Sequence, residues 1–132
     1  MSNPSYDLQA QWIGDGSLES SFTQDGNTLL MTSPRIGTPF NIRHVVFEPE
    51  YYYEVTLTQL DGHFSVGVVH PDEFKPGYAT KGMFFNGNLT NASAALKTSW
   101  GPHLKQGDVV GVRTKRQGDS LEVAYYLNGR CL

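Results

Sequence analysis

Residues 51–58 read YYYEVTLT, and this stretch decides the fold class. Apolar or aromatic side chains occupy every second position, at Tyr51, Tyr53, Val55 and Leu57. Successive side chains of a β-strand point to opposite faces, so these four share one face while Tyr52 and Glu54 lie on the other. The alternation therefore predicts a strand with one buried face and one exposed face.

The same alternation continues on both sides of this stretch. Residues 64–70 (FSVGVVH) follow a turn at Asp61-Gly62, and we expect them to pair with residues 51–58 as an antiparallel hairpin. Gly67 lies in the middle of the second strand, which indicates that a neighbouring backbone or a large side chain comes close to it. Further strands are expected at residues 28–32, 44–47, 82–85, 109–114 and 121–127.

Turn and loop residues separate these strands. Asn128-Gly129 is the strongest hairpin-turn signal in the chain, and Asp108 beside Gly107 is expected to accept local backbone hydrogen bonds in a structural role. Long loops are expected at residues 71–80 (PDEFKPGYAT) and 88–99. Gly or Pro interrupts most windows that could hold a helix, so we expect none beyond one or two turns.

At least seven short strands with turns between them predict an all-β fold, a sandwich of two antiparallel sheets. The chain of 132 residues has the size of one domain, which we expect to span residues 1–132. Its core is expected to hold the inward side chains Leu30, Val45, Tyr53, Val55, Leu57, Phe64, Val66, Val68, Val110, Val112, Val123 and Tyr125.

The net charge of the chain disfavours some classes of binding partner. Ten Lys and Arg against 13 Asp and Glu give a net charge of −3, which provides no overall positive field to attract nucleic acid or an anionic membrane. A basic cluster at Arg113, Lys115 and Arg116, with Lys105 nearby in the sequence, lacks interleaved aromatic residues. We interpret this cluster as a solvated turn, and we expect no nucleic-acid or membrane partner.

The compartment follows from the cysteine count and the N-terminus. A single cysteine, Cys131, cannot form a disulfide framework, which fits a reducing environment. The start MSNPSYDLQAQW lacks the basic and apolar regions of a secretory signal, and no apolar run approaches the roughly 18 residues of a membrane span. The protein is therefore expected in the cytoplasm or nucleus.

The sequence offers little for catalysis or metal binding. Asp61 and His63 are two residues apart, and His70 begins the next loop, yet no HExxH-like spacing accompanies them. Cys131 has no histidine partner at a recognisable spacing, and no GxSxG turn or phosphate-binding glycine loop precedes a helix. We therefore expect no catalytic residue, no metal and no cofactor.

Six motifs carry a resemblance to a known family: YYYEV at 51–55, SVGVV at 65–69, MFFNG at 83–87, SWGP at 99–102, QGDVVGV at 106–112 and VAYYLNG at 123–129. In this order they resemble the SPRY domain family over about residues 49–132, with a looser fit from residue 25. The resemblance implies a two-sheet sandwich of concanavalin or jelly-roll type with variable loops at one end. It also implies a non-catalytic module that binds peptides or partner surfaces through those loops.

The chain departs from the family at its C-terminal end. In the family more chain follows the Asn-Gly turn and completes the sheets, whereas here only Arg130, Cys131 and Leu132 follow it. Either the sequence is a fragment, or its N-terminal segment or another molecule fills the gap. An uncovered strand edge also allows self-association.

The expected partner-binding site combines loop aromatics with polar residues. Large aromatic side chains in Gly- and Pro-rich loops cost solubility unless they pack or bind. We expect aromatic anchors at Phe74, Tyr78, Phe84 and Trp100, and orienting contacts from Arg43, Asp61 and Asn86. The resemblance adds that Phe84 matches, approximately, a family position that often carries a peptide-contacting aromatic.

Phe84 and Trp100 are further expected to line one shallow pocket, flanked by Phe74 or Tyr78. Two other functions stay open on the sequence alone. One is a lectin-like carbohydrate-binding module, because such sandwiches stack sugars on Trp or Tyr. The other is a structural subunit whose open sheet edge is completed by a partner strand.

Overall fold

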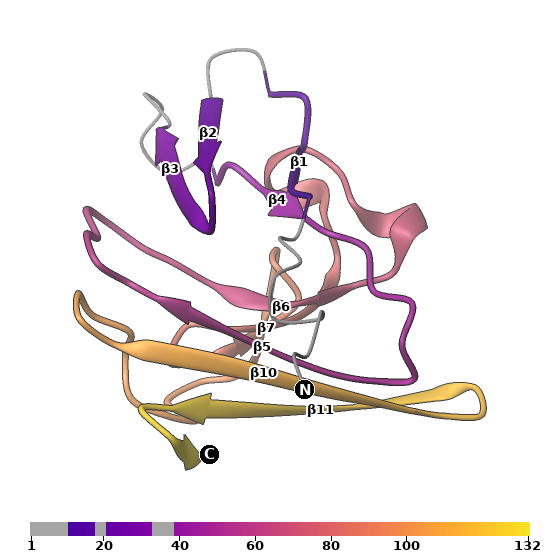
Figure 1. Cartoon of the computed structure of the whole chain (residues 1–132). Coiled ribbons are helices and arrows are strands. Elements are labelled where there is room, and N and C mark those ends of the chain that lie inside the picture. Colours follow the sequence, from indigo (N-terminus) through magenta and orange to yellow (C-terminus); the bar gives the residue numbers. More distant parts are fainter. Residues whose placement is uncertain (1–10, 18–20, 33–38) are drawn as a thin grey trace, which may run out of the picture.

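The computed structural model describes residues 11–17, 21–32 and 39–132. In these residues the protein is all-β, with its strands in antiparallel sheets (Figure 1). The helical elements in the described part are two single turns of 3₁₀-helix, η2 (Pro71–Glu73) and η3 (Gly77–Ala79). None of the described helices is long and apolar enough to cross a membrane.

Two four-stranded sheets contain most of the strands. The first sheet has the order β12-β11-β10-β5 and consists of β5 (Glu50–Thr56), β10 (Val109–Gln117), β11 (Ser120–Leu127) and β12 (Arg130–Cys131). The second sheet has the order β6-β7-β8-β9 and consists of β6 (Val66–Val69), β7 (Gly82–Phe85), β8 (Leu89–Thr90) and β9 (Ala95–Lys97).

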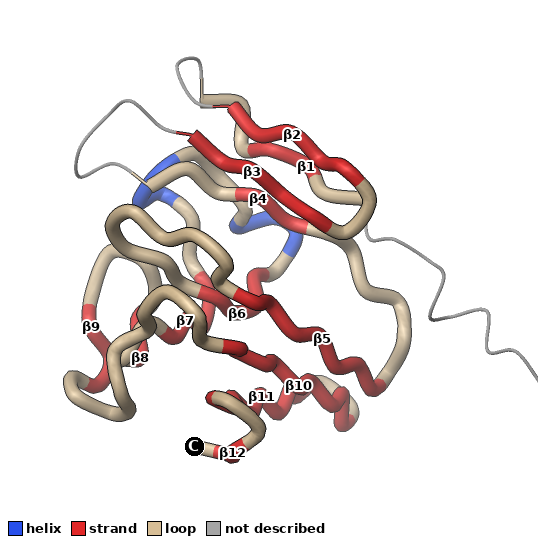
Figure 2. The backbone as a smooth tube through the Cα atoms, turned by 60° about the vertical axis from the view of Figure 1, so that its left-hand side comes forward, coloured by secondary structure: helices blue, strands red, loops and turns tan. Residues whose placement is uncertain are grey.

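Two short ribbons complete the described structure. β1 (Ile13–Gly14) pairs with β4 (Ile42–Arg43), and β2 (Ser21–Asp25) pairs with β3 (Thr28–Thr32). Figure 2 shows both ribbons on the same side of the molecule, with β11 and β12 on the opposite side. The N-terminal third of the described chain therefore lies apart from the C-terminal hairpin.

Residues of the first and second sheets form the core. Val110 and Val112 of β10 and Phe85 of β7 are completely buried, and Val66 of β6 is 5% exposed. The residues packed around them come from both sheets, which follows from the period-two alternation of their strands. Burying these side chains is the main source of stability, at about 25 cal/mol for each Å² of apolar surface removed from water.

Two tyrosine hydroxyls cross from the first sheet to the second. The Tyr53 hydroxyl donates to the carbonyl oxygen of Gly67 at 3.0 Å, and the Tyr125 hydroxyl donates to that of Met83 at 2.7 Å. Burial raises the pKa of both phenols, so they stay neutral donors at physiological pH. These bonds satisfy buried hydroxyls and fix how the two sheets are placed relative to each other.

The strand predictions at 28–32, 82–85, 109–114 and 121–127 are confirmed by β3, β7, β10 and β11. β10 and β11 pair as an antiparallel hairpin, and the hairpin turn expected at Asn128-Gly129 joins β11 to β12, with positive φ at both residues. The close approach expected at Gly67 is also confirmed, because a Cβ there would overlap the carbonyl oxygen of Met83 on β7.

Three local predictions are wrong. β5 pairs with β10, and β6 pairs with β7, so residues 51–58 and 64–70 lie in different sheets rather than in one hairpin. Residues 44–47 form no strand, and the strand before them is β4. The stretch 88–99, expected as a loop, contains β8 and β9, which pair around a turn where Asn91 Oδ1 accepts from the amide of Ala94.

Two residues of the expected core lie at the surface, where Leu30 is 61% exposed and Val45 is 49% exposed. In β3 the alternation places the half-buried Leu29 and Met31 on the covered face, so Leu30 points outward. Val45 follows β4 in a segment without strand pairing, so no alternation directs its side chain inward. The other expected core residues are buried or partly buried.

An aromatic cluster connects the β1–β4 ribbon to the first sheet. The His44 ring lies 4.6 Å from the ring of Trp12, 5.7 Å from that of Tyr51 and 5.6 Å from that of Tyr53. Burial lowers the pKa of His44, although a hydrogen bond with the Val45 backbone and the charge of Glu48 act in the opposite direction. The neutral imidazole thus packs as one more aromatic ring between ribbon and sheet.

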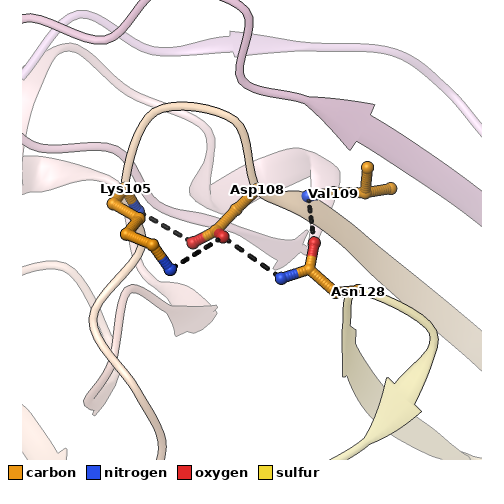
Figure 3. Close-up of polar contacts among 4 residues, drawn as sticks. All are labelled: Lys105, Asp108, Val109 and Asn128. Atoms are coloured by element: carbon orange, nitrogen blue, oxygen red, sulfur yellow. Dashed lines mark hydrogen bonds and ion pairs between the residues drawn. The ribbon is translucent and has the colours of Figure 1, made fainter.

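Asp108 connects the start of β10 to the turn between β11 and β12 (Figure 3). Its carboxylate accepts from the backbone amide of Lys105 at 2.9 Å, the Lys105 ammonium at 3.3 Å and the Asn128 amide at 3.2 Å. Asn128 Oδ1 in turn accepts from the amide of Val109 at 2.8 Å. The local backbone hydrogen bond expected for Asp108 is therefore present.

We expect Asp108→Ala to lower the free energy of unfolding by about 2 kcal/mol at neutral pH, because it leaves donors around a 3%-exposed site without their acceptor. Burial alone would raise the pKa of Asp108, but its hydrogen bonds and the Lys105 charge hold it below the ordinary 3.8. The carboxylate therefore contributes to the free energy of unfolding above pH 3.8, and this contribution is lost as the pH falls below that value.

Urea unfolding at neutral pH and in acid measures both effects. The difference between wild type and Asp108→Ala is expected to shrink in acid, whereas Asp119→Ala, an exposed residue of the β10–β11 turn, should change stability by less than about 0.5 kcal/mol. Equal loss at both pH values would show that the carboxylate charge has no role.

Candidate functional site

The loop between β6 and β7 carries two of the expected aromatic anchors on an ordered backbone. Pro71 begins η2, where the fixed φ of proline suits the first helical position. His70 caps this turn, because its Nδ1 accepts from the amide of Asp72 at 3.3 Å. Phe74 ends η2, and Tyr78 lies in η3.

A buried polar network attaches this loop to the β1–β4 ribbon. Asp15 accepts from the amide of Asn41 at 2.9 Å and from that of Gly77 at 3.4 Å, and Asn41 Nδ2 donates to the carbonyl oxygens of Lys75 and Gly77. Thr80, which is 3% exposed, accepts from the amide of Lys75 at 2.6 Å and donates to the Lys75 carbonyl oxygen. Residues from three parts of the chain thus hold the loop in one conformation.

The charge of Asp15 is part of this attachment. Burial acts to raise the pKa of Asp15, but hydrogen bonds from Ser17, Asn41 and Gly77 outweigh it and keep the pKa below its ordinary value. Gly77 has a φ of +59°, a conformation that costs other residues energy, and it is buried against this carboxylate. The ionised Asp15 is therefore a structural acceptor rather than a group presented to a ligand.

Arg43 of β4 lies over the ring of Phe74, with its guanidinium carbon 5.1 Å from the ring centroid. This is a cation–π arrangement, and the flat contact fixes the orientation of the guanidinium. In the described part of the chain, Arg43 Nε is the one buried side-chain polar atom without a hydrogen-bond partner. No carboxylate of the described residues forms an ion pair with Arg43.

Arg43, Phe74 and Tyr78 together are called the Arg43 surface below. Arg43 and Phe74 are half-buried, and Tyr78 is 54% exposed in the same loop as Phe74. Arginine and tyrosine are the residue types enriched where few side chains dominate binding energy. Chemically, this surface offers aromatic area beside an oriented cation that forms no ion pair with a described residue.

The other two expected anchors lie elsewhere. Trp100 packs against the core, with its ring 5.7 Å from the ring of Phe85 and 6.2 Å from that of Tyr125. Phe84 lies on the opposite face of β7 from Phe85, where its ring contacts Gly82. The expectation that Phe84 and Trp100 line one pocket is therefore wrong, because adjacent positions of a strand point to opposite faces.

The expected polar contacts also divide between two ends of the molecule. Val66 pairs with Phe85 at one end of the β6–β7 hairpin, and Val69 pairs with Gly82 at the other. Asp61 and Asn86 belong to loops beyond the first end, whereas the Arg43 surface lies beyond the second. The seven expected partner-binding residues thus do not form one site.

Sequence reasoning missed the residues that support the Arg43 surface. Asp15 and Asn41 carry no motif, and they are 62 and 36 residues from Gly77, so only the folded chain shows their contact. Of the basic cluster, Arg113 pairs with Glu50, while Lys115 and Arg116 are exposed. Among the described residues, no group of three or more His, Cys, Asp or Glu is arranged to hold a metal ion.

Comparisons of the chain with protein-family models, curated proteins and solved structures find no match.

Proposed function

We propose that the protein is a non-catalytic interaction module that binds a peptide or partner surface through the Arg43 surface. The observation that carries the proposal is the Arg43 guanidinium of β4, which forms no ion pair with a described residue and stacks on Phe74 of a loop held by buried hydrogen bonds. A partner carboxylate or carbonyl oxygen would accept hydrogen bonds from the guanidinium, and apolar partner groups would cover Phe74 and Tyr78. Holding the site in place before binding lowers the entropy cost of association.

The resemblance to the SPRY domain family points to the same class of function, because that family uses loops on a two-sheet sandwich to bind peptides. Under this proposal the first and second sheets are the two layers of the sandwich. The single cysteine fits an intracellular partner in the cytoplasm or nucleus.

Selection from a random peptide library tests this proposal whatever the natural partner is. We expect enriched peptides to contain an acidic residue or a free carboxyl end, and to bind Arg43→Ala about thirtyfold more weakly than wild type, equivalent to about 2 kcal/mol. Arg43→Lys keeps the charge but loses the flat guanidinium, so it should recover little of the affinity. Arg116→Ala, which removes an exposed arginine of β10, is the matched control.

The outcomes separate the candidate functions. Peptides that bind Arg43→Ala as tightly as wild type, with a native melting curve for the variant, would refute the site. A protein that selects no peptide but binds members of a glycan panel would instead be a carbohydrate-binding module.

Strand addition is a second candidate function, and the edge of β11 favours it. β11 has eight residues, and among the described residues only two of them, Tyr126 and Leu127, pair with β12. Beside β11 lies a cavity of about 170 Å³ lined by Met83, Leu89, Trp100, Leu121, Val123 and Tyr125. A partner that protects the amides of Leu121 and Val123 from hydrogen exchange and binds Arg43→Ala undiminished would select this function.

A further inference from the structure

A polar cleft lies at the end of the β6–β7 hairpin away from the Arg43 surface. Its volume is about 360 Å³, and its lining comes from the loop before β6, the turn between β7 and β8, and the loop before β10: Gly62, His63, Phe64, Asn86, Asn88, His103 and Leu104. This size is at the lower end of the range for small-molecule sites. The proposed interaction through the Arg43 surface does not use this cleft.

The two asparagines of the cleft are oriented by their own hydrogen bonds. Asn86 Oδ1 accepts from the amide of Asn88 at 3.0 Å, and Asn88 Oδ1 accepts from the amide of Ser99 at 2.8 Å. Both side-chain oxygens are therefore engaged, whereas no hydrogen bond of either Nδ2 group is present among the described residues. The amides consequently offer donors to a ligand.

Histidines supply the remaining polar groups of the lining. His63 and His103 are both exposed, and the His103 ring packs so closely on Gly87 that a Cβ there would lie 2.8 Å from His103 Nδ1. No Asp or Glu is among the lining residues, and the nearby Asp108 is occupied by Lys105 and Asn128. The lining therefore carries no carboxylate, and its asparagine amides offer donors.

We propose that this cleft binds a small molecule or group bearing an oxyanion, either a carboxylate or a phosphate. Such a group accepts several hydrogen bonds and donates none when ionised, which matches two amide groups with engaged oxygens and the N–H group that each imidazole carries. Phe64 and Leu104 provide an apolar wall for the carbon part that carries the group.

The test is a titration of the full chain, followed by ¹H–¹⁵N NMR, with inorganic phosphate in one arm and succinate in the other. We expect saturable shifts of the Gly87 amide and of the Asn86 and Asn88 side-chain amides in at least one arm, with a dissociation constant below about 1 mM. The arm with the tighter binding identifies phosphate or carboxylate as the preferred oxyanion.

Asn86→Asp is the informative variant because it keeps the oxygen that accepts from the Asn88 amide while it removes the donors. It should weaken binding at least tenfold and leave the melting curve native. Asn91→Asp is the matched control, since Asn91 Oδ1 makes the same kind of local bond to the amide of Ala94 outside the cleft. Its affinity should stay within about twofold of wild type.

Other outcomes overturn the inference. Shifts that grow linearly without saturation in both arms, or equal affinity of Asn86→Asp and wild type, would exclude an oxyanion site here. Asp61→Asn removes the exposed carboxylate preceding Gly62 and should not weaken binding, because a carboxylate repels an anion; a loss of binding would also contradict the inference. Arg43→Ala should leave the titration unchanged, so this result is independent of the proposed interaction function.

Discussion

Replacement of Phe85 by alanine is expected to lower the free energy of unfolding by about 3–5 kcal/mol, a large part of the whole stability of a domain this size. Phe85 is 0% exposed, and its ring lies 5.5 Å from that of Tyr125 and 5.7 Å from that of Trp100. The variant loses the transfer free energy of the ring and leaves a cavity in the core.

Urea denaturation of Phe85→Ala and Phe47→Ala measures this effect with a matched substitution. Phe47 is 86% exposed, so its removal should change stability by less than about 0.5 kcal/mol. Similar losses for the two variants would contradict the placement of Phe85 in the core. Phe85→Leu should recover most of the loss, because it refills most of the cavity without polar atoms.

Phe85 also illustrates how far the sequence predicts this fold. The alternation predicts its strand at residues 82–85, yet the aromatic that the sequence singles out for function is its neighbour Phe84. Period-two alternation says that adjacent residues point to opposite faces, but it does not say which face is covered. That information comes from the partner sheet, which places Phe85 against Trp100 and leaves Phe84 against Gly82.

Strand partners are harder to predict than the strands themselves. The hairpin of β10 and β11 is predictable because the turn between them is short and contains a Gly with φ +59° at position 118. The loop from Leu57 to Ser65 carries turn residues too, but it crosses between sheets, and Leu57 bonds instead to Asp108 and Gly107. A local turn signal thus fixes a change of direction and not a pairing.

The candidate sites depend even more on contacts distant in sequence. Arg43 and Phe74 are both expected from sequence to bind a partner, but only the fold stacks one on the other and separates them from Asn86. The polar cleft has a signal in sequence, because Asn86 and Asn88 flank a glycine turn. The sequence does not show which of their side-chain atoms already form hydrogen bonds, and the structure supplies this information.

Gly67→Ala is expected to destabilise the protein by about 3 kcal/mol, although it adds a single methyl group. A Cβ at this position would overlap the Met83 carbonyl oxygen and would lie 2.8 Å from the Cα of Phe84. Both obstacles are backbone atoms of β7, so the methyl group can be accommodated only if β6 and β7 move apart. Such a movement would also disturb the bonds from Tyr53 to Gly67 and from Tyr125 to Met83.

Two further variants test whether overlap with the backbone of β7 causes the loss of stability in Gly67→Ala. Gly107 has a φ of +94° and open space where an added Cβ would lie, so Gly107→Ala should cost about 1 kcal/mol through conformation alone. In the Gly67→Ala background, Phe84→Ala removes the one side-chain obstacle, the Phe84 ring, and leaves the backbone in place. Because the obstruction comes mainly from the Met83 carbonyl, chemical denaturation should show no recovery in the double variant. Full recovery would mean that the ring, and not the close approach of the two strands, requires a glycine at position 67.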